Sequence, residues 1–159
     1  MEVLEASTAS QLAEAKALIV AYAAEVGVDL GFQGYEEELA RFPGEFSPPS
    51  GAVLLALEGT DPVGVVALRR FHGPVAEMKR LYVRPRARSH GIGRALGKAV
   101  VEKAAALGYE RIRLDTLPTM AAAIELYASL GFKEIPAYRF NPFAGARYME
   151  LALWPRHRS

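Results

Sequence analysis

The sequence predicts a single α+β domain with a mixed sheet. Two apolar runs separated by a short turn in the first half indicate a β-hairpin. In the second half an alternating strand, a long Ala-rich helix and another alternating strand follow one another, which predicts a β-α-β crossover. A length of 159 residues fits one domain over 1–159, and 51% hydrophobic content is enough for a buried core.

The first half of the chain is predicted to begin with a strand and a capped helix. Thr8 and Gln11 match a capping box, in which each side chain bonds to backbone at the helix start. Apolar residues recur at helical spacing up to Val26, and Gly27 ends the helix. The predicted elements here are strands at 1–6, 52–57 and 63–70, a helix at 8–26 and a short acidic helix at 35–42.

The second half is predicted to alternate strands and helices. The strands are expected at 76–83, 111–116, 132–135 and 146–153, and the helices at 91–107 and 120–130, giving the order β-α-α-β-β-β-α-β-α-β-β. Strand alternation over 77–83 places Glu77, Lys79, Leu81 and Val83 on one face, and Met78, Arg80 and Tyr82 on the other.

The net charge of +1 hides a strong asymmetry along the chain. Residues 1–68 carry 2 basic and 11 acidic side chains, whereas residues 69–113 carry 12 basic and 3 acidic ones. Between 78 and 101 there are seven Lys or Arg and no acid. Such a concentration of cations is typical of proteins that bind phosphate, nucleic acid or another anion.

Several classes of protein are excluded or disfavoured by composition. The chain has no cysteine, which excludes disulfides, thiolate zinc sites and a cysteine nucleophile. Its three histidines lack metal-ligand spacing, so no metal is expected. The N-terminus does not resemble a signal peptide, and no run approaches 18 apolar residues. We therefore expect a cytoplasmic protein without a membrane partner.

The segment 84–96 has the composition of an anion-binding helix start. Gly91 and Gly93 let the backbone approach a ligand, and the neighbouring arginines donate to phosphates, so a pyrophosphate-bearing ligand is inferred. The Rossmann fingerprint fails because Leu96 stands where the third glycine belongs. The Walker pattern fails because Ala99 follows Gly97-Lys98. Two glycines alone also fit an ordinary helix start.

Two motifs stand out in the second half of the chain. The first is the pattern Arg88-x-x-Gly91-x-Gly93, after the strand at 77–83, and the second is the stretch 123–132, AIELYASLGF. They resemble, in that order, the acetyl-CoA-binding motif and the second signature of the GNAT superfamily of N-acetyltransferases, and the resemblance covers essentially the whole chain. It implies a mostly antiparallel mixed sheet flanked by helices, with two splayed strands that form the cofactor cleft.

The resemblance also implies how acetyl-CoA is held. The backbone of Leu81, Tyr82 and Val83 would pair with the pantetheine. The pyrophosphate would be held by Arg88, Ser89, His90, Gly91, Ile92, Gly93 and Arg94. The family often has an Asn seven residues before the helix tyrosine, and here Met120 stands in that place. A side-chain hydrogen bond from this position to the cofactor is therefore not predicted.

Tyr127 and Glu77 are the catalytic candidates. Tyr127 matches the family's usual general acid; its phenol, with a pKa of about 10, protonates a thiolate of pKa about 8.5 only if the site strengthens its acidity. The alternative is a core tyrosine. Glu77, the only acid between Asp61 and Glu102, is the candidate base. Its alternative is an ion pair with Lys79 or Arg69, and a water relay would replace a direct base.

The acceptor side is predicted from position. The segment 32–38 lies where the family usually builds its acceptor wall, although a run of Glu also fits a solvated helix face. The substrate-binding candidates are Phe32, Gln33, Tyr35, Tyr138 and Asn141.

The predicted function is transfer of an acetyl group from acetyl-CoA to a primary amine of a small molecule or peptide. The amine attacks directly in a ternary complex. One alternative is a GNAT-like sensor that binds acyl-CoA without turnover. The other is a nucleic-acid-binding module using 78–101, disfavoured because Tyr82 is the only aromatic residue there, so no nucleic-acid partner is expected. A homodimer is left open.

Overall fold

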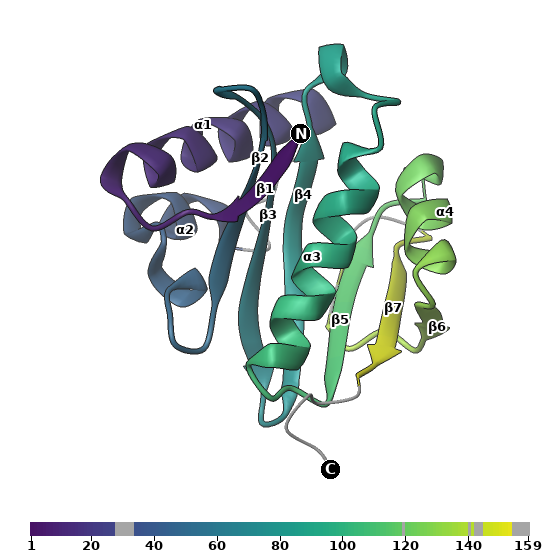
Figure 1. Ribbon diagram of the computed structural model, residues 1–159. Coiled ribbons are helices and arrows are strands. Elements are labelled where there is room, and N and C mark those ends of the chain that lie inside the picture. Colours follow the sequence, from purple (N-terminus) through teal and green to yellow (C-terminus); the bar gives the residue numbers. More distant parts are fainter. Residues whose placement is uncertain (28–33, 119, 140, 142–144, 154–159) are drawn as a thin grey trace.

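The protein is built on one seven-stranded sheet with helices on both faces (Figure 1). The computed structural model describes residues 1–27, 34–118, 120–139, 141 and 145–153. The strands are β1 (Glu2–Glu5), β2 (Ala52–Glu58), β3 (Asp61–His72), β4 (Val75–Val83), β5 (Arg111–Thr116), β6 (Lys133–Ile135) and β7 (Arg147–Ala152). The helices are α1 (Ala9–Val26), α2 (Tyr35–Arg41), α3 (Ile92–Ala106) and α4 (Ala121–Ser129), with 3-10 turns η2 (Gly44–Phe46) and η3 (Pro85–Ala87).

The order of the strands is β1-β2-β3-β4-β5-β7-β6, and the sheet is mixed. All neighbouring strands are antiparallel except β4 and β5, which run parallel and are joined by the crossover helix α3. The predicted element order and the β-α-β crossover are therefore confirmed. The capping box at Thr8 and the left-handed Gly27 that ends α1 are also present.

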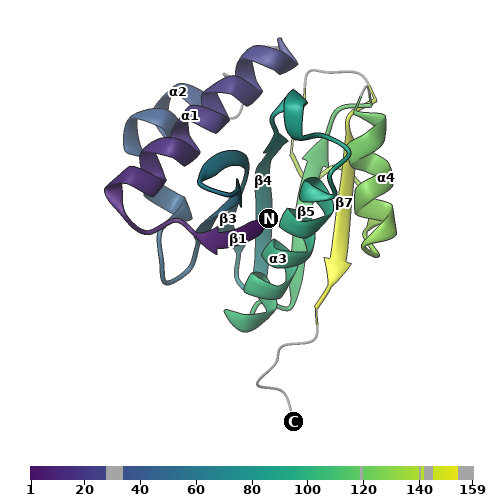
Figure 2. The ribbon, with the colours of Figure 1, turned by 45° about the horizontal axis from the view of Figure 1, so that its top comes forward.

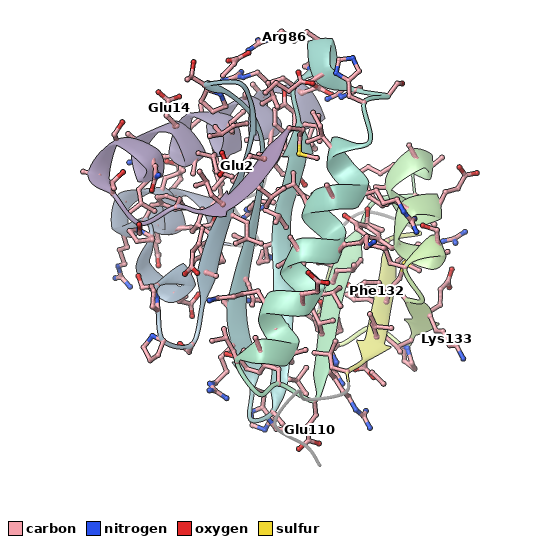
Figure 3. The ribbon with its side chains drawn as sticks, viewed as in Figure 1. Glu2, Glu14, Arg86, Glu110, Phe132 and Lys133 are labelled. Carbon is pink, nitrogen blue, oxygen red and sulfur yellow. The ribbon has the colours of Figure 1, made fainter. Side chains whose placement is uncertain are left out.

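Two hydrophobic clusters lie on opposite faces of the sheet. Figure 2 shows the helices that cover these faces, with α1 on one side of the sheet and α3 on the other. Leu54 and Val66 pack with α3, while their neighbours Leu55 and Val65 pack with α1, as the period of two along a strand requires. Side chains fill the space between α3 and the sheet, whereas Glu14 and Lys133 point away from the body (Figure 3). Helices α1 and α2 thus cover one face, and α3 and α4 cover the other.

A β-bulge at Arg80 reverses the alternation of β4. Arg80 has φ of 62°, and the register with β3 shifts between the Ala67–Lys79 and Val65–Tyr82 pairs. Leu81 consequently packs in the α3 cluster, and Tyr82 in the α1 cluster. The prediction that Leu81 and Val83 share a face with Glu77 and Lys79 was therefore wrong, because an inserted residue shifts every later side chain to the other face.

Strands β4 and β5 separate after a short paired stretch. Their parallel pairing joins 75–77 to 111–113 only, yet β4 continues to Val83 and β5 to Thr116. The expected splayed strands are thus confirmed, and no described strand pairs with the edge of β4 beyond Glu77 that faces β5. Within the described ranges, no helix is long and apolar enough to cross a membrane.

Candidate functional site

The splay of β4 and β5 leads into a cleft of about 570 Å³. Its walls come from the end of α1, the end of β4, the turn before α3 and the start of α4. The lining includes six of the predicted cofactor residues: Leu81, Tyr82, Val83, Arg88, Ser89 and Gly93. Six of the ten residues that the resemblance assigned to the cofactor therefore line one cavity.

The other four predicted cofactor residues lie around this cleft without lining it. His90 bonds through Nδ1 to Glu58, 2.9 Å away, and the Arg94 guanidinium donates to Ser129 Oγ at 2.8 Å. Ile92 is buried in the core under α3, and Gly91 is the left-handed residue that begins the helix. The Ile92 side chain is therefore not available to a ligand, whereas the backbone amides of Ile92 and Arg94 remain candidates for contact with one.

The start of α3 is open to an anion. No side chain caps it, so the first backbone N–H groups have no partner within the helix. Gly93 has an ordinary φ, and a methyl group built on it would lie 3.6 Å from Leu126 Cδ2, an ordinary contact. Packing within the protein therefore does not require glycine at position 93. Glycine would be required there by a ligand that approaches the backbone closely.

Arg88 spans the mouth of the cleft. Its Nε donates to the Val83 carbonyl at 3.0 Å and its Nη2 to Glu25 at 2.5 Å, while its guanidinium lies 5.7 Å from the centre of the Tyr82 ring. Ser89, the next residue, has φ of 69°. In the described part of the chain Ser89 and Arg80 are the non-glycine residues with positive φ, and both border the cleft region. Such strain gathers at functional sites.

A smaller chamber, of about 60 Å³, adjoins the cleft where the strands diverge. The two cavities share Tyr22, Leu81, Met120 and Ala123 in their walls. The chamber adds Lys79, Asp115 and Tyr127 to these. Met120, the residue in place of the family's usual Asn, borders both cavities. Its sulfur accepts a hydrogen bond from Thr116 Oγ1 at 3.5 Å.

Tyr127 reaches the chamber from α4. Its side chain is only 6% exposed, and its ring lies 5.9 Å from that of Phe132. Burial, with the nearby Tyr22 and Asp115, raises the pKa of Tyr127 well above its usual range. The phenol therefore stays protonated at neutral pH and serves as a donor, but these surroundings do not strengthen its acidity as the sequence argument required.

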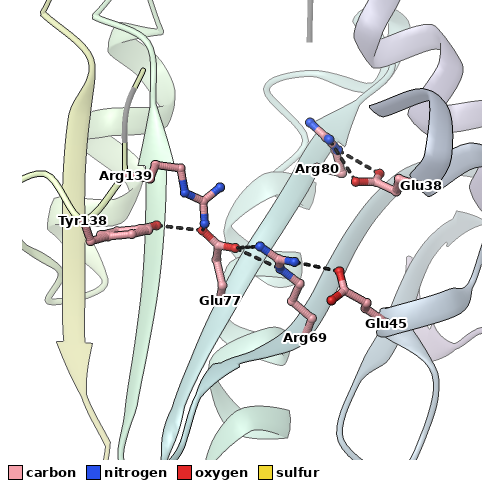
Figure 4. Close-up of polar contacts among 7 residues, drawn as sticks. All are labelled: Glu38, Glu45, Arg69, Glu77, Arg80, Tyr138 and Arg139. Carbon is pink, nitrogen blue, oxygen red and sulfur yellow. Dashed lines mark hydrogen bonds and ion pairs between the residues drawn. The ribbon is translucent and has the colours of Figure 1, made fainter. Parts of the chain in front are cut away.

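Glu77 lies in a closed network of ion pairs (Figure 4). The side chain is 0% exposed and accepts from Arg69 Nε at 3.0 Å, from Arg69 Nη2 at 2.7 Å, from the Tyr138 hydroxyl at 2.8 Å and from Arg139. Burial alone raises the pKa of Glu77, but the charges of Lys79, Arg139 and Arg69 outweigh it and lower the pKa to about 2. The ion pair with Arg69 that the sequence allowed is present, and so acidic a carboxyl makes a poor base.

A third cavity, of about 310 Å³, lies between α2, η2 and the sheet. Lys79 belongs to both this cavity and the chamber. Of the predicted acceptor residues, Tyr35 stacks on Arg80 at 5.5 Å, and Tyr138 and Asn141 lie partly buried in the loop between β6 and β7. Phe32 and Gln33 lie outside the described residues. Tyr35, Tyr138 and Asn141 line none of the three cavities.

The acidic and basic segments of the sequence pair with each other. The guanidinium of Arg80, a residue that is only 5% exposed, donates two hydrogen bonds, of 2.9 and 3.0 Å, to the Glu38 carboxylate of α2 (Figure 4). Further contacts between the two segments, among the described residues, include Glu5–Lys103, Glu25–Arg88, Glu45–Arg69, Asp61–Arg86 and Glu58–His90. Much of the positive charge in 69–103 is therefore neutralised within the fold rather than displayed as an open basic surface.

Comparison with known proteins decides the family. A family model described as the acetyltransferase (GNAT) family matches residues 18–132. The chain belongs to the GNAT family. An uncharacterized N-acetyltransferase of Schizosaccharomyces pombe is 42% identical over 141 residues, covering 87% of this chain and 86% of that protein. The human N-acetylaspartate synthetase is 36% identical over 91 residues, covering 57% of this chain and 30% of the synthetase.

The fold agrees with this membership. An aminoglycoside 6'-N-acetyltransferase solved in complex with coenzyme A superposes with a TM-score of 0.73 at 19% identity, covering 98% of this chain and 99% of the other. GNAT proteins bind acyl-CoA, and the uncapped start of α3, Arg88 and the unhindered Gly93 suit its pyrophosphate. The described residues contain no group of three or more His, Asp or Glu suited to a metal ion.

Sequence reasoning missed four residues of this GNAT site: Tyr22, Glu25, Lys79 and Asp115. Tyr22 and Glu25 were assigned only to an amphipathic helix, and nothing local indicates that its end meets Arg88. Asp115 did carry a signal. It alternates with the apolar Ile112 and Leu114 on β5, so it faces away from the α3 core. A carboxylate placed where two strands diverge is a candidate for substrate contact.

Proposed function

We propose that this chain is an N-acetyltransferase that moves an acetyl group from acetyl-CoA to a primary amine of a small molecule or peptide. The observation that carries the proposal is the continuity of two cavities. The cleft beside the start of α3 shares four wall residues with the chamber that Tyr127 lines. A pantetheine arm lying in the cleft would therefore end beside Tyr127.

The proposed reaction is direct attack in a ternary complex. The amine nitrogen forms a bond to the acetyl carbonyl carbon, the carbon–sulfur bond breaks, and the amine loses a proton while the thiolate gains one. Bound acetyl-CoA supplies the activated acetyl group. Arg88 and the amides at the start of α3 hold the pyrophosphate, and the unpaired edge of 81–83 holds the pantetheine. The Tyr127 hydroxyl, which burial keeps protonated, donates a hydrogen bond to the leaving sulfur, and the proton that the amine loses reaches this sulfur through water.

Glu77 is proposed to organise the site instead of acting as its base. Its network ties Tyr138 and Arg139, from the loop after β6, to Arg69 on β3. The acceptor amine then loses its proton through water. Glu77 lines none of the three cavities, which supports a positioning role.

Two observations bear on the alternatives and the acceptor. The nucleic-acid interpretation is disfavoured because Arg80 and Arg86 are each paired with an acid. An acyl-CoA sensor would need no donor at the sulfur, whereas Tyr127 borders the chamber. Similarity to an N-acetylaspartate synthetase makes L-aspartate the first acceptor to test. Homodimerisation and a cytoplasmic location stay predictions.

The test uses the purified full chain. Calorimetry with coenzyme A is expected to show micromolar binding that Arg88→Ala weakens at least tenfold. Thiol release from acetyl-CoA is then followed with amino acids, polyamines, aminoglycosides and peptides, and at least one is expected to be acetylated. Absence of coenzyme A binding overturns the cofactor assignment. Binding without turnover on any acceptor favours the sensor.

A further inference from the structure

Two charged side chains that line the chamber have no hydrogen-bond partner among the residues that the structure describes. Lys79 is 7% exposed, yet its ammonium makes no hydrogen bond or ion pair with any described residue. Asp115 Oδ2 is fully buried and likewise has no partner across the part of the chain that the structure describes. Both side chains line the same small cavity but do not bond to each other.

This arrangement costs stability, because a buried carboxylate oxygen without a partner is unfavourable. Burial lowers the pKa of Lys79 to about 8 although Glu77 partly compensates, so the group is still mainly an ammonium at pH 7. A buried carboxylate oxygen and an ammonium on the wall of one cavity, both without a protein partner among the described residues, are explained if a ligand supplies the missing partners.

The positions of the two residues define an orientation for that ligand. Asp115 lies on β5 in the chamber that also holds Tyr127, where the acetyl group would be transferred. Lys79 lies on β4 between the Glu77 network and the Arg80–Glu38 pair, whose members are drawn in Figure 4. Its side chain borders both the chamber and the cavity under α2. A ligand entering from that cavity therefore passes the cation before it reaches the carboxylate.

Resting on the proposed N-acetyltransferase function, we propose that the acceptor is a free amino acid bound at both ends. Asp115 accepts hydrogen bonds from its ammonium group, and Lys79 donates to its carboxylate. The side chain of the amino acid extends into the cavity under α2. An acceptor without an acid group, such as a polyamine, places no anion against Lys79 and is a poor substrate.

The first experiment compares matched acceptors. Each of the twenty L-amino acids is assayed beside its amide and its decarboxylated amine, with thiol release from acetyl-CoA as the readout. The accepted amino acid is expected to exceed its amide and its amine in kcat/KM by about 10–100-fold, the scale of one charged hydrogen bond. Amides or polyamines acetylated as efficiently as any amino acid overturn the carboxylate assignment and leave the acetyltransferase function intact.

The second experiment assigns each end to its residue. Lys79→Met is expected to raise KM for the amino acid at least tenfold while leaving KM for its amide within about twofold. Asp115→Asn is expected to raise KM for both. Lys16→Met, an exposed lysine on α1, is the matched control and leaves both unchanged. Equal effects of Lys79→Met on the amino acid and its amide contradict the proposal, and thermal unfolding shows whether each variant is folded.

Binding keeps the proposal testable if no acceptor is turned over. Amino acids are then titrated by calorimetry into the wild type and Lys79→Met, each saturated with coenzyme A. Binding that Lys79→Met weakens at least tenfold supports two-ended recognition even though the transferase function has failed. Absence of amino-acid binding in the wild type overturns the inference itself.

Discussion

Glu25 and Arg88 form an ion pair across the mouth of the cofactor cleft. Arg88 Nη2 lies 2.5 Å from Glu25 Oε2, and the Tyr82 hydroxyl donates to the other oxygen of the same carboxylate at 3.1 Å. The pair joins the end of α1 to the turn before α3, so two acidic oxygens lie next to the arginine expected to bind pyrophosphate. Glu25 and the cofactor therefore compete for one guanidinium.

Replacing Glu25 by Gln is expected to tighten coenzyme A binding. Exposed ion pairs contribute up to about 1 kcal/mol, so the dissociation constant should fall by as much as about fivefold when Arg88 no longer has to leave a carboxylate. Isothermal titration calorimetry of the full chain measures this. Glu14→Gln, also on α1 and exposed, makes the same change of net charge away from the cleft. Equal gains in both variants would mean that only long-range charge is involved.

Gly93→Ala separates ligand contact from packing. The added methyl group meets only ordinary contacts with Leu126 and Val83, and alanine is favoured over glycine within a helix. The melting temperature should therefore stay the same or rise slightly, while coenzyme A binding weakens at least tenfold because the methyl group faces the ligand. Differential scanning fluorimetry and calorimetry provide the two readouts. A loss of stability with unchanged affinity would assign the glycine to the fold alone.

Local signals in the sequence were enough to predict most elements, whereas the splayed strands were expected from the family resemblance. The capping box at Thr8, the left-handed Gly27 and the glycine-bearing start of α3 act within a few residues, so their meaning is readable without the fold. The position of β7 between β5 and β6 was not predicted, because it depends on pairing between distant segments. The bulge at Arg80 was missed because a strand's apolar pattern does not show an inserted residue.

The acceptor side was the least predictable part. Lys79 and Asp115 come from different strands, and they share a chamber only because the β4–β5 pairing stops after Glu77 and Arg113. No spacing in the sequence encodes where a parallel pair ends. Similarly, the acidic first segment was interpreted as an acceptor wall, whereas several of its acids pair with arginines of β3, β4 and the turn before α3.

Tyr127→Phe removes a hydroxyl that makes no hydrogen bond with any described residue. We expect kcat to fall by about 100-fold or more, the usual contribution of one positioned hydrogen-bond donor to the charged leaving atom, with coenzyme A affinity and melting temperature unchanged. Steady-state kinetics and calorimetry measure these. Tyr109→Phe is the structural comparison, because its hydroxyl donates to the Ser50 carbonyl away from the chamber, so stability should fall while kcat does not. Matching losses of affinity and stability in Tyr127→Phe would identify a core tyrosine.

Glu77 is expected to make the fold acid-sensitive. Its pKa is lowered from 4.5 to about 2, so the native state binds fewer protons than the unfolded chain in that interval. The stabilisation is complete above pH 4.5 and is lost as the pH falls through 2. Glu77→Gln should lower the free energy of unfolding at pH 7 by about 3–5 kcal/mol, because Arg69 and Arg139 lose their buried partner.

Urea unfolding between pH 2 and pH 7 checks this, and Glu77→Gln should have the flatter profile. Glu45→Gln, at the exposed end of Arg69, should change stability by less than about 1 kcal/mol. If the free energy of unfolding had the same pH dependence in the wild type and in Glu77→Gln, Glu77 would not be the source of the acid sensitivity.

Lys79→Met is expected to stabilise the protein, which is unusual for the loss of a buried charge. The ammonium is faced by Glu77 and Asp115 and by the cations Arg80 and Arg139, and burial lowers its pKa from 10.5 to about 8. Between these values the unfolded chain binds more protons than the native state, so the penalty is complete below pH 8 and disappears as the pH rises to 10.5. The melting temperature of the variant should thus exceed the wild type by several degrees at pH 7, and the gain should shrink above pH 8. Thermal unfolding from pH 6 to pH 10 measures both the gain and its pH dependence. If Lys79→Met were less stable than the wild type at pH 7, the Lys79 ammonium would stabilise the fold, contrary to this prediction.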